Sequence, residues 1–388
     1  MRELTFVRTG HLEWRERPDP ALSEPTDALV RPFVASRCDG DCLPLHRSVS
    51  RPMQAGLKLG LIDPVVASIV GHVPFQGPFA IGHECVAQVI AVGAGVTGLA
   101  VGDVVVVPWA VSCGTCEACQ LGLTAKCSTM SAASPGRELA AFGFGPASGA
   151  WGGMVADALR IPFADHMLVK VPEGVDPLRV AAASDNLADA WRSVVPPLRQ
   201  RPGGRVLVIG GGGQSIGLYA AGLAVAHGAS VVDYLDDRDS RLEIAESFGA
   251  RVHRVDKARR KSVLPALPGR YDVAVEASSH PQGLRDALRA LRPGGICTGT
   301  GYYLSPGTKL PVMDMYATSA TLQVGVSHVR PVLPELLDFI ATTGFEAERV
   351  TSLVADWDDA PEAYQAHTTK LVLHRPPLSP IPQPERDS

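Results

Sequence analysis

The chain has 388 residues, of which 46% are hydrophobic and 20% charged, with a formal net charge of −4. This length allows two or three domains that each bury a core, and the composition is that of an ordinary globular protein. The slight negative charge gives no general attraction to nucleic acid or to an anionic membrane, and we expect the basic cluster at 259–261 in a surface loop. The N-terminus lacks an apolar signal core, and no stretch reaches the roughly 18 apolar residues of a membrane span, so we expect a cytoplasmic protein without a membrane partner.

The first part of the chain, to about residue 110, reads as short strands separated by turns. The expected strands are 3–7, 27–35, 85–93 and 101–110. This pattern predicts a β-rich lobe.

Within and just after this lobe stand four cysteines, Cys113, Cys116, Cys119 and Cys127. Three thiols at two-residue gaps and a fourth shortly after suit one tetrahedral Zn²⁺, with sulfurs about 2.3 Å from the ion. Four thiolates leave no position open for water or substrate, so this ion would support the fold and not catalyse. Two disulfides or a chance cluster are the alternatives, but nothing else in the chain suggests an oxidising compartment.

From Gly203 onward, strand-like and helix-like segments alternate, which indicates a parallel, doubly wound sheet. The expected strands are 205–210, 230–235, 251–255, 271–277 and 295–301, with helices over 214–227, up to Gly249 and up to Arg292. A helix over 333–344 and strands at 352–357 and 370–375 then return to the first lobe. The expected division is 1–185, 186–322 and 323–375, followed by a Pro-rich, disordered tail, 376–388.

The first strand–helix unit of the alternating region carries a glycine-rich loop. Gly211 and Gly213 follow the strand, and the helix opens with four further candidate cofactor-binding residues, Gln214, Ser215, Ile216 and Gly217. Glycines let a pyrophosphate approach the backbone, and the N–H groups and dipole of the helix start favour its negative charge. The loop is one residue longer than the usual G-x-G-x-x-G, but its place between a strand and a helix indicates a dinucleotide site.

The following strand ends in Asp236 and Asp237, about 20 residues beyond the glycines. A carboxylate there accepts hydrogen bonds from the adenosine ribose and repels a 2′-phosphate, which favours NAD. NADP stays open because Arg238 and Arg241 are close in the sequence. A solvated turn that caps the next helix is the alternative interpretation of the two aspartates.

A second group of metal-ligand residues is dispersed along the chain. Cys38 follows a strand, His83 precedes one, and Asp185 stands near the junction of the two lobes. Cysteine, histidine and carboxylate are suitable ligands for a catalytic zinc, which uses three protein ligands and keeps a fourth position open. Spacing alone does not identify this site, and for Cys38 or His83 taken singly a structural role is the simpler interpretation.

Taken in order, these motifs resemble those of the zinc-containing medium-chain alcohol dehydrogenases over roughly residues 20–375. The resemblance implies a GroES-like, β-rich catalytic domain, a doubly wound Rossmann domain that binds NAD(P), two zinc ions per chain and a homodimer or homotetramer. It implies that Cys38, His83 and Asp185 bind the catalytic zinc, that Glu84 can approach the metal, and that Asp41 orients a ligand.

The same resemblance implies hydride transfer between an alcohol, or an aldehyde or ketone, and a nicotinamide cofactor. Thr300, Gly301 and Tyr302 end a strand at the carboxyl edge of the sheet, where they would meet the carboxamide of the nicotinamide. Trp191 stands where relatives have small residues beside that ring, so it would narrow the wall there.

Two departures from the family pattern concern the proton path and the substrate pocket. Gly40 replaces a hydroxyl residue that begins the usual proton relay, and His46 either takes over through water or is a plain surface residue. Cys38 and His83 are 45 residues apart, about twice the spacing of many relatives. The extra segment, 51–78, would shape the substrate pocket or form a lid, or it packs outside the active site at a subunit contact.

The expected function is therefore that of a zinc-dependent oxidoreductase of alcohols or carbonyls, and apolar residues near the extra segment favour a bulky or hydrophobic substrate. A reductase of activated double bonds on the same scaffold is the alternative, supported by the missing hydroxyl at Gly40. A non-enzymatic zinc-binding interaction protein would require all three dispersed ligands to be incidental. Buried apolar packing is expected for the remaining cysteines, Cys42, Cys85 and Cys297.

Overall fold

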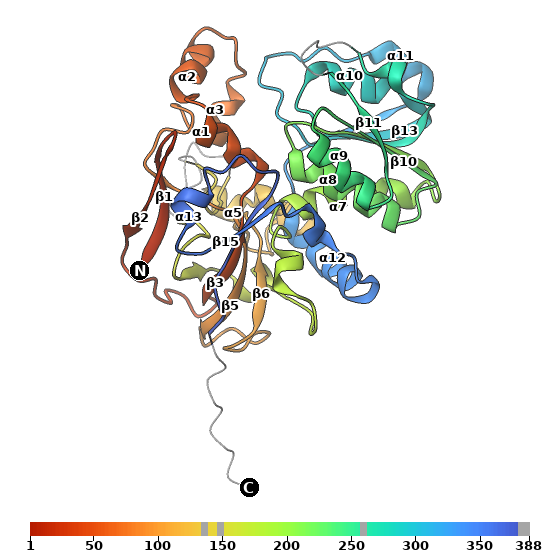
Figure 1. Cartoon of the computed structure of the whole chain (residues 1–388). Helices are drawn as coiled ribbons and strands as arrows, with labels where there is room; N and C mark the ends of the chain where they lie inside the picture. Colours follow the sequence, from red (N-terminus) through yellow and green to blue (C-terminus); the bar gives the residue numbers. More distant parts are fainter. Residues whose placement is uncertain (133–138, 146–150, 257–261, 379–388) are drawn as a thin grey trace.

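The computed structural model describes residues 1–132, 139–145, 151–256 and 262–378. A β-rich lobe and a lobe built on a parallel sheet stand side by side (Figure 1). The predicted basic cluster at 259–261 and most of the predicted tail, 379–388, lie outside the described residues. Within the described part of the chain, no helix is both long and apolar enough to cross a membrane.

The β-rich lobe is organised around a seven-stranded sheet. Its strands are β3 (Ala28–Ser36), β5 (Glu84–Val92), β6 (Val104–Val107), β7 (Leu159–Ile161), β8 (Val169–Lys170), β15 (Leu353–Asp356) and β16 (Leu371–His374). The order is β15-β16-β3-β5-β6-β8, with β7 also paired to β3, and only β15 and β16 run parallel. Strands β15 and β16 come from the end of the chain, so the chain's last strands lie in the sheet of the first lobe.

A smaller antiparallel sheet completes this lobe. Its strands are β1 (Arg2–Arg8), β2 (His11–Glu16) and β4 (Phe79–Ala80), in the order β2-β1-β4. Leu4 and Phe6 of β1 share one apolar core with Val30 of β3 and Val89 of β5. The two sheets are therefore held together by the side chains that alternate inward along each strand.

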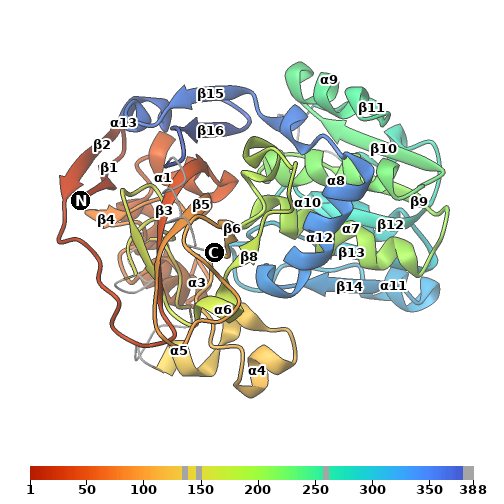
Figure 2. The same ribbon diagram turned by 90° about the horizontal axis from the view of Figure 1, so that it is seen from below.

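Short helices connect the strands of the β-rich lobe. They are η1 (Asp39–Asp41), α1 (Cys42–His46), α2 (Ser50–Lys58), α3 (Val65–Val70), α4 (Glu117–Gln120), η2 (Thr124–Lys126), α5 (Ser128–Ala132), α6 (Ala164–Met167), η3 (Pro177–Val180), η6 (Ala347–Val350) and α13 (Ala360–Ala363). Figure 2 shows α4 and α5 projecting from the lobe next to α6.

The second lobe contains a six-stranded, entirely parallel sheet. Its strands are β9 (Arg205–Ile209), β10 (Val231–Asp236), β11 (Arg251–Arg254), β12 (Tyr271–Glu276), β13 (Leu291–Gly299) and β14 (Thr321–Val324), in the order β11-β10-β9-β12-β13-β14. The associated helices are α7 (Asn186–Arg199), α8 (Gln214–Ala226), α9 (Asp239–Ser247), η5 (Leu264–Ala266), α10 (Pro281–Arg289), α11 (Val312–Thr318) and α12 (Val329–Thr343).

The central strands of this sheet are buried, as an apolar run such as Val206–Ile209 requires. Helix α8 is apolar on almost every side and is buried between the sheet and neighbouring helices. It packs closely there because Gly222 has no Cβ, which would otherwise meet the Phe248 ring at 3.0 Å. The predicted fold class, a β-rich domain plus a doubly wound parallel sheet, is confirmed.

Several boundaries and elements differ from the prediction. Helix α10 ends at Arg289 instead of Arg292, because Leu291 already pairs with Tyr271 before an irregular register. Helix α7 is absent from the prediction, and Pro196 and Pro197 inside its last turn weaken the helical pattern. The prediction that Trp191 narrows the nicotinamide wall is wrong, since its indole is 1% exposed and contacts His227 and Phe339 in the helical core.

Candidate active site and cofactor cleft

Strand register brings the three dispersed ligand residues together. Ser36 of β3 pairs with Glu84 of β5, so Cys38 just after β3 lies beside His83 just before β5. Asp185 reaches them because Ser184 exchanges hydrogen bonds with the backbone of Cys85 at 3.0 Å. The three ligands need no fixed spacing in the sequence, because the pairing of β3 with β5 brings Cys38 and His83 close together.

The three ligand atoms form a compact group, which we call the Cys-His-Asp set (Cys38, His83 and Asp185). Asp185 Oδ2 lies 3.2 Å from Cys38 Sγ and 3.4 Å from His83 Nε2, and all three ligand atoms lie within 4.8 Å of one another. Both ring nitrogens of His83 are buried without a hydrogen-bond partner among the described residues. Buried imidazole nitrogens normally have partners, so this orphaned ring fits a metal ligand.

The charges around the Cys-His-Asp set favour a cation. Burial raises the pKa of Cys38 well above its usual value, and the negative charges of Asp185 and Asp41 raise it further. Burial lowers the pKa of His83, but Asp41 and Asp185 outweigh that effect and raise it to about 9. The site therefore stabilises positive charge at its centre, either a proton on His83 or a metal ion held by all three ligands.

Two further predicted residues lie next to the set. Asp41 is buried, with its Oδ1 3.8 Å from His83 Nδ1, and burial raises its pKa to about 6. Glu84 is fully buried and bonded to Lys370 Nζ and Ser36 Oγ, both at 2.5 Å. Lys370 is thus bonded to the carboxylate of Glu84, the residue predicted to approach the metal.

Sequence analysis missed Lys370 and Asn186, which connect the site internally. Lys370 is fully buried and also donates to Asn186 Oδ1 at 2.8 Å. Asn186 donates from Nδ2 to Cys38 Sγ at 3.3 Å and to Asp185 Oδ2 at 3.1 Å. Only the adjacency of Asn186 to Asp185 could have indicated its role; nothing in the sequence sets Lys370 apart from a surface lysine.

The four predicted zinc thiols form a second compact group, the thiol lobe (Cys113, Cys116, Cys119 and Cys127). Their sulfurs all lie within 4.8 Å of one another, and all eight cysteines of the chain are free thiols. The backbone N–H of Cys113 donates to Cys127 Sγ at 3.3 Å, and that of Cys116 donates to Cys113 Sγ at 3.4 Å. Such N–H groups stabilise thiolates, so the lobe is arranged to hold a metal ion.

The glycine-rich loop lies between β9 and α8, as predicted, and it is tightly packed. A Cβ at Gly212 would lie 2.8 Å from Ser279 Oγ. Gly213 donates to Ala277 O at 2.7 Å, so its N–H is already used. At the helix start, the N–H groups of Ser215 and Ile216 donate to Asp39 Oδ2 at 2.8 and 3.3 Å.

The predicted ribose ligand, Asp236, is engaged by an arginine. Arg241 Nε and Nη2 donate to the two carboxylate oxygens of Asp236 at 3.0 and 2.6 Å, and Tyr234 donates its hydroxyl at 3.0 Å. Arg241 also reaches Gln214 Oε1 at 3.1 Å. The structure therefore joins three predicted cofactor residues, but as an ion pair instead of a bare carboxylate.

The three residues predicted to meet the nicotinamide differ in their surroundings. Thr300 donates both its N–H and its hydroxyl to Glu276 O, and Gly301 lies so close to Ser279 that a Cβ would be 2.7 Å from its Cα. Tyr302 is 47% exposed, yet its crowded surroundings and then the charges of Cys38 and Asp185 raise its pKa. The charges of Cys38 and Asp185 thus act on the Tyr302 hydroxyl.

Asp189 of α7 is a buried carboxylate that no sequence motif indicated. It lies one helical turn after Asp185, and burial raises its pKa to about 6 although Arg192 donates to it at 2.5 Å. Its charge also contributes to the raised pKa of Tyr302.

His46, the candidate for the proton relay, lies apart from these groups. Its ring stacks on that of His367 at a centroid distance of 4.1 Å, and burial, His367 and Arg37 lower its pKa. Among the described residues no hydrogen bond joins His46 to the Cys-His-Asp set. Gly40 donates its N–H to Cys38 Sγ at 3.3 Å, and its carbonyl accepts the N–H of Cys42.

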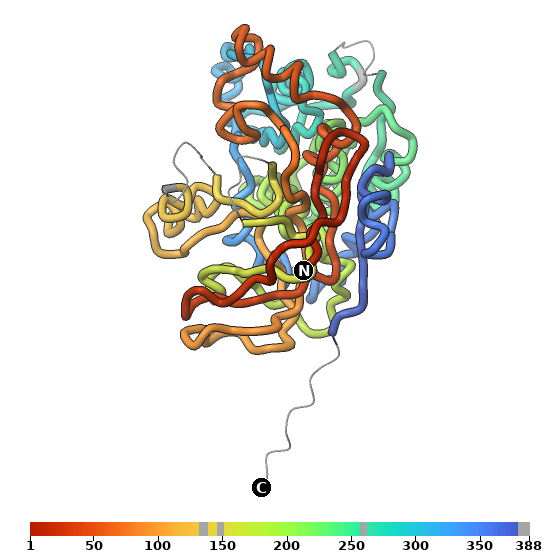
Figure 3. Tube along the Cα trace, turned by 90° about the vertical axis from the view of Figure 1, so that its left-hand side faces the viewer, coloured from red at the N-terminus to blue at the C-terminus, as the bar shows by residue number. Residues whose placement is uncertain are grey.

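The extra segment lies at one end of the β-rich lobe, on the side of the loop that follows β13 (Figures 1 and 3). Met53 of α2 and Val70 of α3 form a small apolar cluster against which Leu304 packs. Asp63 donates its N–H to Leu304 O at 2.8 Å. The segment therefore bridges to the second lobe.

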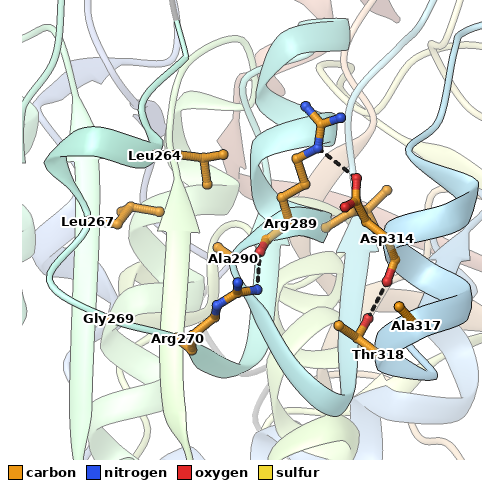
Figure 4. Close-up of a pocket in the computed structure, with 10 residues that line it drawn as sticks. Leu264, Leu267, Gly269, Arg270, Arg289, Ala290, Asp314, Ala317 and Thr318 are labelled. Atoms are coloured by element: carbon orange, nitrogen blue, oxygen red, sulfur yellow. Dashed lines mark hydrogen bonds and ion pairs between the residues drawn. The ribbon is translucent and has the colours of Figure 1, made fainter.

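A separate pocket of about 520 Å³ lies between α10 and α11 (Figure 4). Its residues precede β12, β13 and β14, so it opens at the amino ends of these strands. Its charged groups are bonded internally, with Arg289 paired to Asp314 at 2.8 Å and Arg270 donating to Arg289 O at 2.6 Å. Nucleotides bind at carboxyl ends in such sheets, so this pocket is not the cofactor site.

Comparisons with known proteins identify related dehydrogenases. Residues 24–173 match the family model of the alcohol dehydrogenase GroES-like domain, and residues 215–342 match that of the zinc-binding dehydrogenases. A probable zinc-binding alcohol dehydrogenase of Mycobacterium tuberculosis is 28% identical over 372 residues, which are 94% of this chain and 84% of that protein. A medium chain reductase/dehydrogenase of an Acremonium species is 32% identical over 315 residues, or 79% of this chain and 94% of that protein. Among solved structures, the alcohol dehydrogenase TADH of Thermus sp. ATN1 has a TM-score of 0.79 at 28% identity, over 96% of this chain and 99% of that one.

Proposed function

Since the chain belongs to the zinc-containing medium-chain dehydrogenase/reductase family, we propose that it transfers a hydride between an alcohol, or its aldehyde or ketone, and a nicotinamide dinucleotide. The observation that carries this proposal is the convergence of Cys38 Sγ, the unpartnered His83 ring and the Asp185 carboxylate within 4.8 Å. Three ligands leave one position of a tetrahedral zinc open, as a catalytic site requires.

Zinc bound there would supply a Lewis acid that favours negative charge on a substrate oxygen. Asp41 Oδ1 lies 3.8 Å from His83 Nδ1, beyond hydrogen-bond distance, and its negative charge favours positive charge at the ring. Lys370 donates to the Glu84 carboxylate at 2.5 Å, and Asn186 donates to both Cys38 and Asp185 and so holds these two side chains in place. The chain's own residues thus orient two of the three ligands.

A second zinc ion is proposed at the thiol lobe, which gives two ions per chain. Four sulfurs within 4.8 Å and the N–H donors around them support this assignment. The segment that carries the four thiols contacts the second lobe, since Ala125 donates its N–H to Nδ1 of His328, which directly precedes α12, at 3.2 Å. We expect the ion to stabilise that contact and to take no part in the reaction.

NAD is the proposed cofactor. Asp236 keeps a carboxylate at the end of β10, which disfavours a 2′-phosphate. Arg241 neutralises much of that charge, so we expect a modest preference over NADP and not an exclusive one.

The substrate is proposed to be a hydrophobic alcohol or carbonyl compound. The extra segment supports this, because its apolar cluster reaches Leu304, two residues beyond Tyr302. The segment would then form one wall of the substrate pocket.

Self-association through β14 is also proposed. This strand is at the edge of the six-stranded sheet, and exposed apolar side chains surround it, with Met313 74%, Tyr316 79% and Val324 64% exposed. Unpaired strand edges and apolar patches of this kind favour pairing with another chain. Replacing Met313 and Tyr316 with Glu should produce monomers in analytical ultracentrifugation; an unchanged mass would exclude this surface.

The function is tested with a panel of alcohols, aldehydes and ketones, followed at the absorbance of the reduced nicotinamide. Turnover of at least one hydrophobic alcohol, lost on zinc removal and recovered when zinc is returned, is expected. If only activated alkenes consume reduced cofactor, the double-bond reductase suggested by Gly40 replaces this proposal.

A further inference from the structure

The start of α8, the predicted pyrophosphate site, already holds a carboxylate from the other lobe. Asp39 Oδ2 accepts the N–H of Ser215 at 2.8 Å and that of Ile216 at 3.3 Å, and Oδ1 accepts the Ser215 hydroxyl at 3.0 Å. These amides are the second and third of a 13-residue helix. They are among the unbonded donors that make a helix start attractive to an anion.

Asp39 is firmly held in this position. It belongs to η1 of the β-rich lobe, is only 8% exposed, and donates its own N–H to Asn186 Oδ1 at 3.3 Å. Ser215 Oγ also reaches Asn186 Oδ1 at 3.0 Å. The backbone of Asp39 is thus bonded to Asn186, while its carboxylate is bonded to the start of α8.

Two cations near the start of α8 are already bonded to other carboxylates. Lys370 contributes positive charge near Asp39, but its ammonium group is bonded to Glu84 at 2.5 Å. Arg241, on the other side of the loop, is bonded to both oxygens of Asp236. A pyrophosphate at the helix start would therefore meet the Asp39 carboxylate with its charge uncompensated by these two groups.

We propose that Asp39 is an affinity-determining residue, which competes with the dinucleotide pyrophosphate for the start of α8 and thereby weakens cofactor binding. This proposal rests on the proposed function, because it assumes that a dinucleotide binds at this loop. Binding requires the pyrophosphate either to displace the carboxylate from the Ser215 and Ile216 amides or to lie beside it. In both cases like charges approach, and such juxtaposition costs binding free energy.

The position of Asp39 also connects the cofactor to the active site. Asp39 follows Cys38 directly, and both contact Asn186. The contact of Asp39 with Asn186 Oδ1 is made by its backbone N–H, whereas Asn186 Nδ2 donates to Cys38 Sγ. Asn186 therefore lies between the residue at the start of α8 and a predicted zinc ligand.

The alternative is that Asp39 only caps α8 and joins the two lobes. A cap contributes stability without affecting nucleotide affinity. The two roles differ in the effect of removing the charge while keeping a hydrogen-bond acceptor, which is the change made in Asp39→Asn.

The test is isothermal titration of the full-length, zinc-loaded protein with NADH and with ADP-ribose. Asp39→Asn should bind both ligands about tenfold more tightly than the unmodified protein, since one like-charge contact of this kind is worth on the order of one decade in affinity. Asp39→Gly, which lacks the carboxylate altogether, should also bind more tightly. Adenosine, measured by competition with NADH, has no phosphate and should show no change.

The matched control is Asp176→Asn, which removes the same charge from a cap on η3, where Asp176 accepts the N–H of Leu178 at 2.9 Å. Its affinities should equal those of the unmodified protein. Equal or weaker binding of ADP-ribose by folded Asp39→Asn and Asp39→Gly, while the unmodified protein binds it, would overturn the proposal and leave the cofactor assignment intact. Absence of dinucleotide binding by all four proteins would overturn the proposed function together with it.

Discussion

The thiol lobe and the Cys-His-Asp set are both compact groups of metal ligands, but the chain assembles them in different ways. All four thiols come from one 15-residue stretch, Cys113 to Cys127, and their hydrogen bonds are largely local. The other three ligands come from segments up to 147 residues apart and meet only because β3, β5 and the start of α7 converge.

The two sites also differ in their surroundings. The thiol lobe has short apolar contacts, with Met130 and Phe163 packed against its cysteines. The Cys-His-Asp set lies among buried charges, including Glu84, Asp41 and Lys370. A short segment whose local fold depends on a bound ion is typical of a structural metal site. Buried charged residues held in place by the surrounding fold are typical of a catalytic site.

The largest effect is expected from loss of a thiol. Cys116→Ser should lose one zinc ion per chain and make the lobe unfold or the protein aggregate, because structural zinc contributes on the order of 10 kcal/mol to local folding. Metal analysis and thermal unfolding check this. Cys297→Ser, a buried thiol outside the lobe, is the control and should keep both ions; an intact metal content in Cys116→Ser would remove the structural zinc from the account.

Removal of a ligand from the Cys-His-Asp set should abolish turnover and leave the fold intact, the opposite of the effect expected at the thiol lobe. Asp185→Ala should lose one zinc ion and nearly all turnover, but keep its cooperative unfolding, because Asn186, Glu84 and Lys370 hold the surrounding segments. The charge-matched control is Asp165→Asn, which changes a carboxylate bonded to Thr97 and Gly98 on the surface. Full zinc content in Asp185→Ala would show that this carboxylate is not a ligand.

The buried ion pair between Lys370 and Glu84 can be tested separately from the metal ligands. Lys370→Met leaves Glu84 buried without its cation and should lower the free energy of unfolding by about 3–5 kcal/mol, a typical cost of breaking a buried pair. Adding Glu84→Gln should recover part of that loss. Urea unfolding of the unmodified protein, both single variants and the double variant measures the coupling, and strictly additive losses would mean that the pair does not stabilise the site.

A smaller effect is expected at the ribose end of the cofactor cleft. Asp236→Ala should free Arg241 for a 2′-phosphate and shift the ratio of NAD to NADP affinity toward NADP by about tenfold. Titration with both cofactors measures the ratio. Asp237→Ala, one residue later and 34% exposed at its side chain, should change it less.

The smallest effect is a pH dependence specific to the catalytic side. The pKa of Asp189 is raised from its ordinary value to about 6, so the folded protein binds this proton more tightly than the unfolded chain does. That contribution to stability is present at low pH and is lost as the pH rises through about 6. Asp189→Asn should therefore gain stability over the unmodified protein by about 1 kcal/mol between about pH 5 and about pH 8. If the difference in unfolding free energy between Asp189→Asn and the unmodified protein does not change with pH, Arg192 compensates the charge of the Asp189 carboxylate fully.

The contrast between the two sites explains what could be predicted from the sequence. The thiol lobe and the glycine-rich loop are local motifs, so their spacing alone indicated them. Cys38, His83 and Asp185 could be grouped only through resemblance to a family, because their contact depends on sheet register. Lys370 is 333 residues from Arg37, whose carbonyl it contacts, and no local pattern marks such a partner.

The same reasoning applies to the fold. Strands with long apolar runs, such as β9 and β12, were predicted within a residue or two. Helix α7 and strand β14 were missed, since prolines interrupt the first and the second is a short edge strand with mostly exposed side chains. The hydrogen bonds from the N–H groups of Ser215 and Ile216 to Asp39 could not be predicted, because Asp39 and α8 belong to different lobes.

The most direct test of the central claim is a crystallographic anomalous-difference map recorded at the zinc absorption edge. The account predicts two zinc peaks per chain: one among the four thiols, and one about 2.3 Å from Cys38 Sγ and within bonding distance of His83 and Asp185. A single peak at the thiol lobe, in crystals of protein prepared with zinc, would contradict the assignment of the Cys-His-Asp set as a metal site.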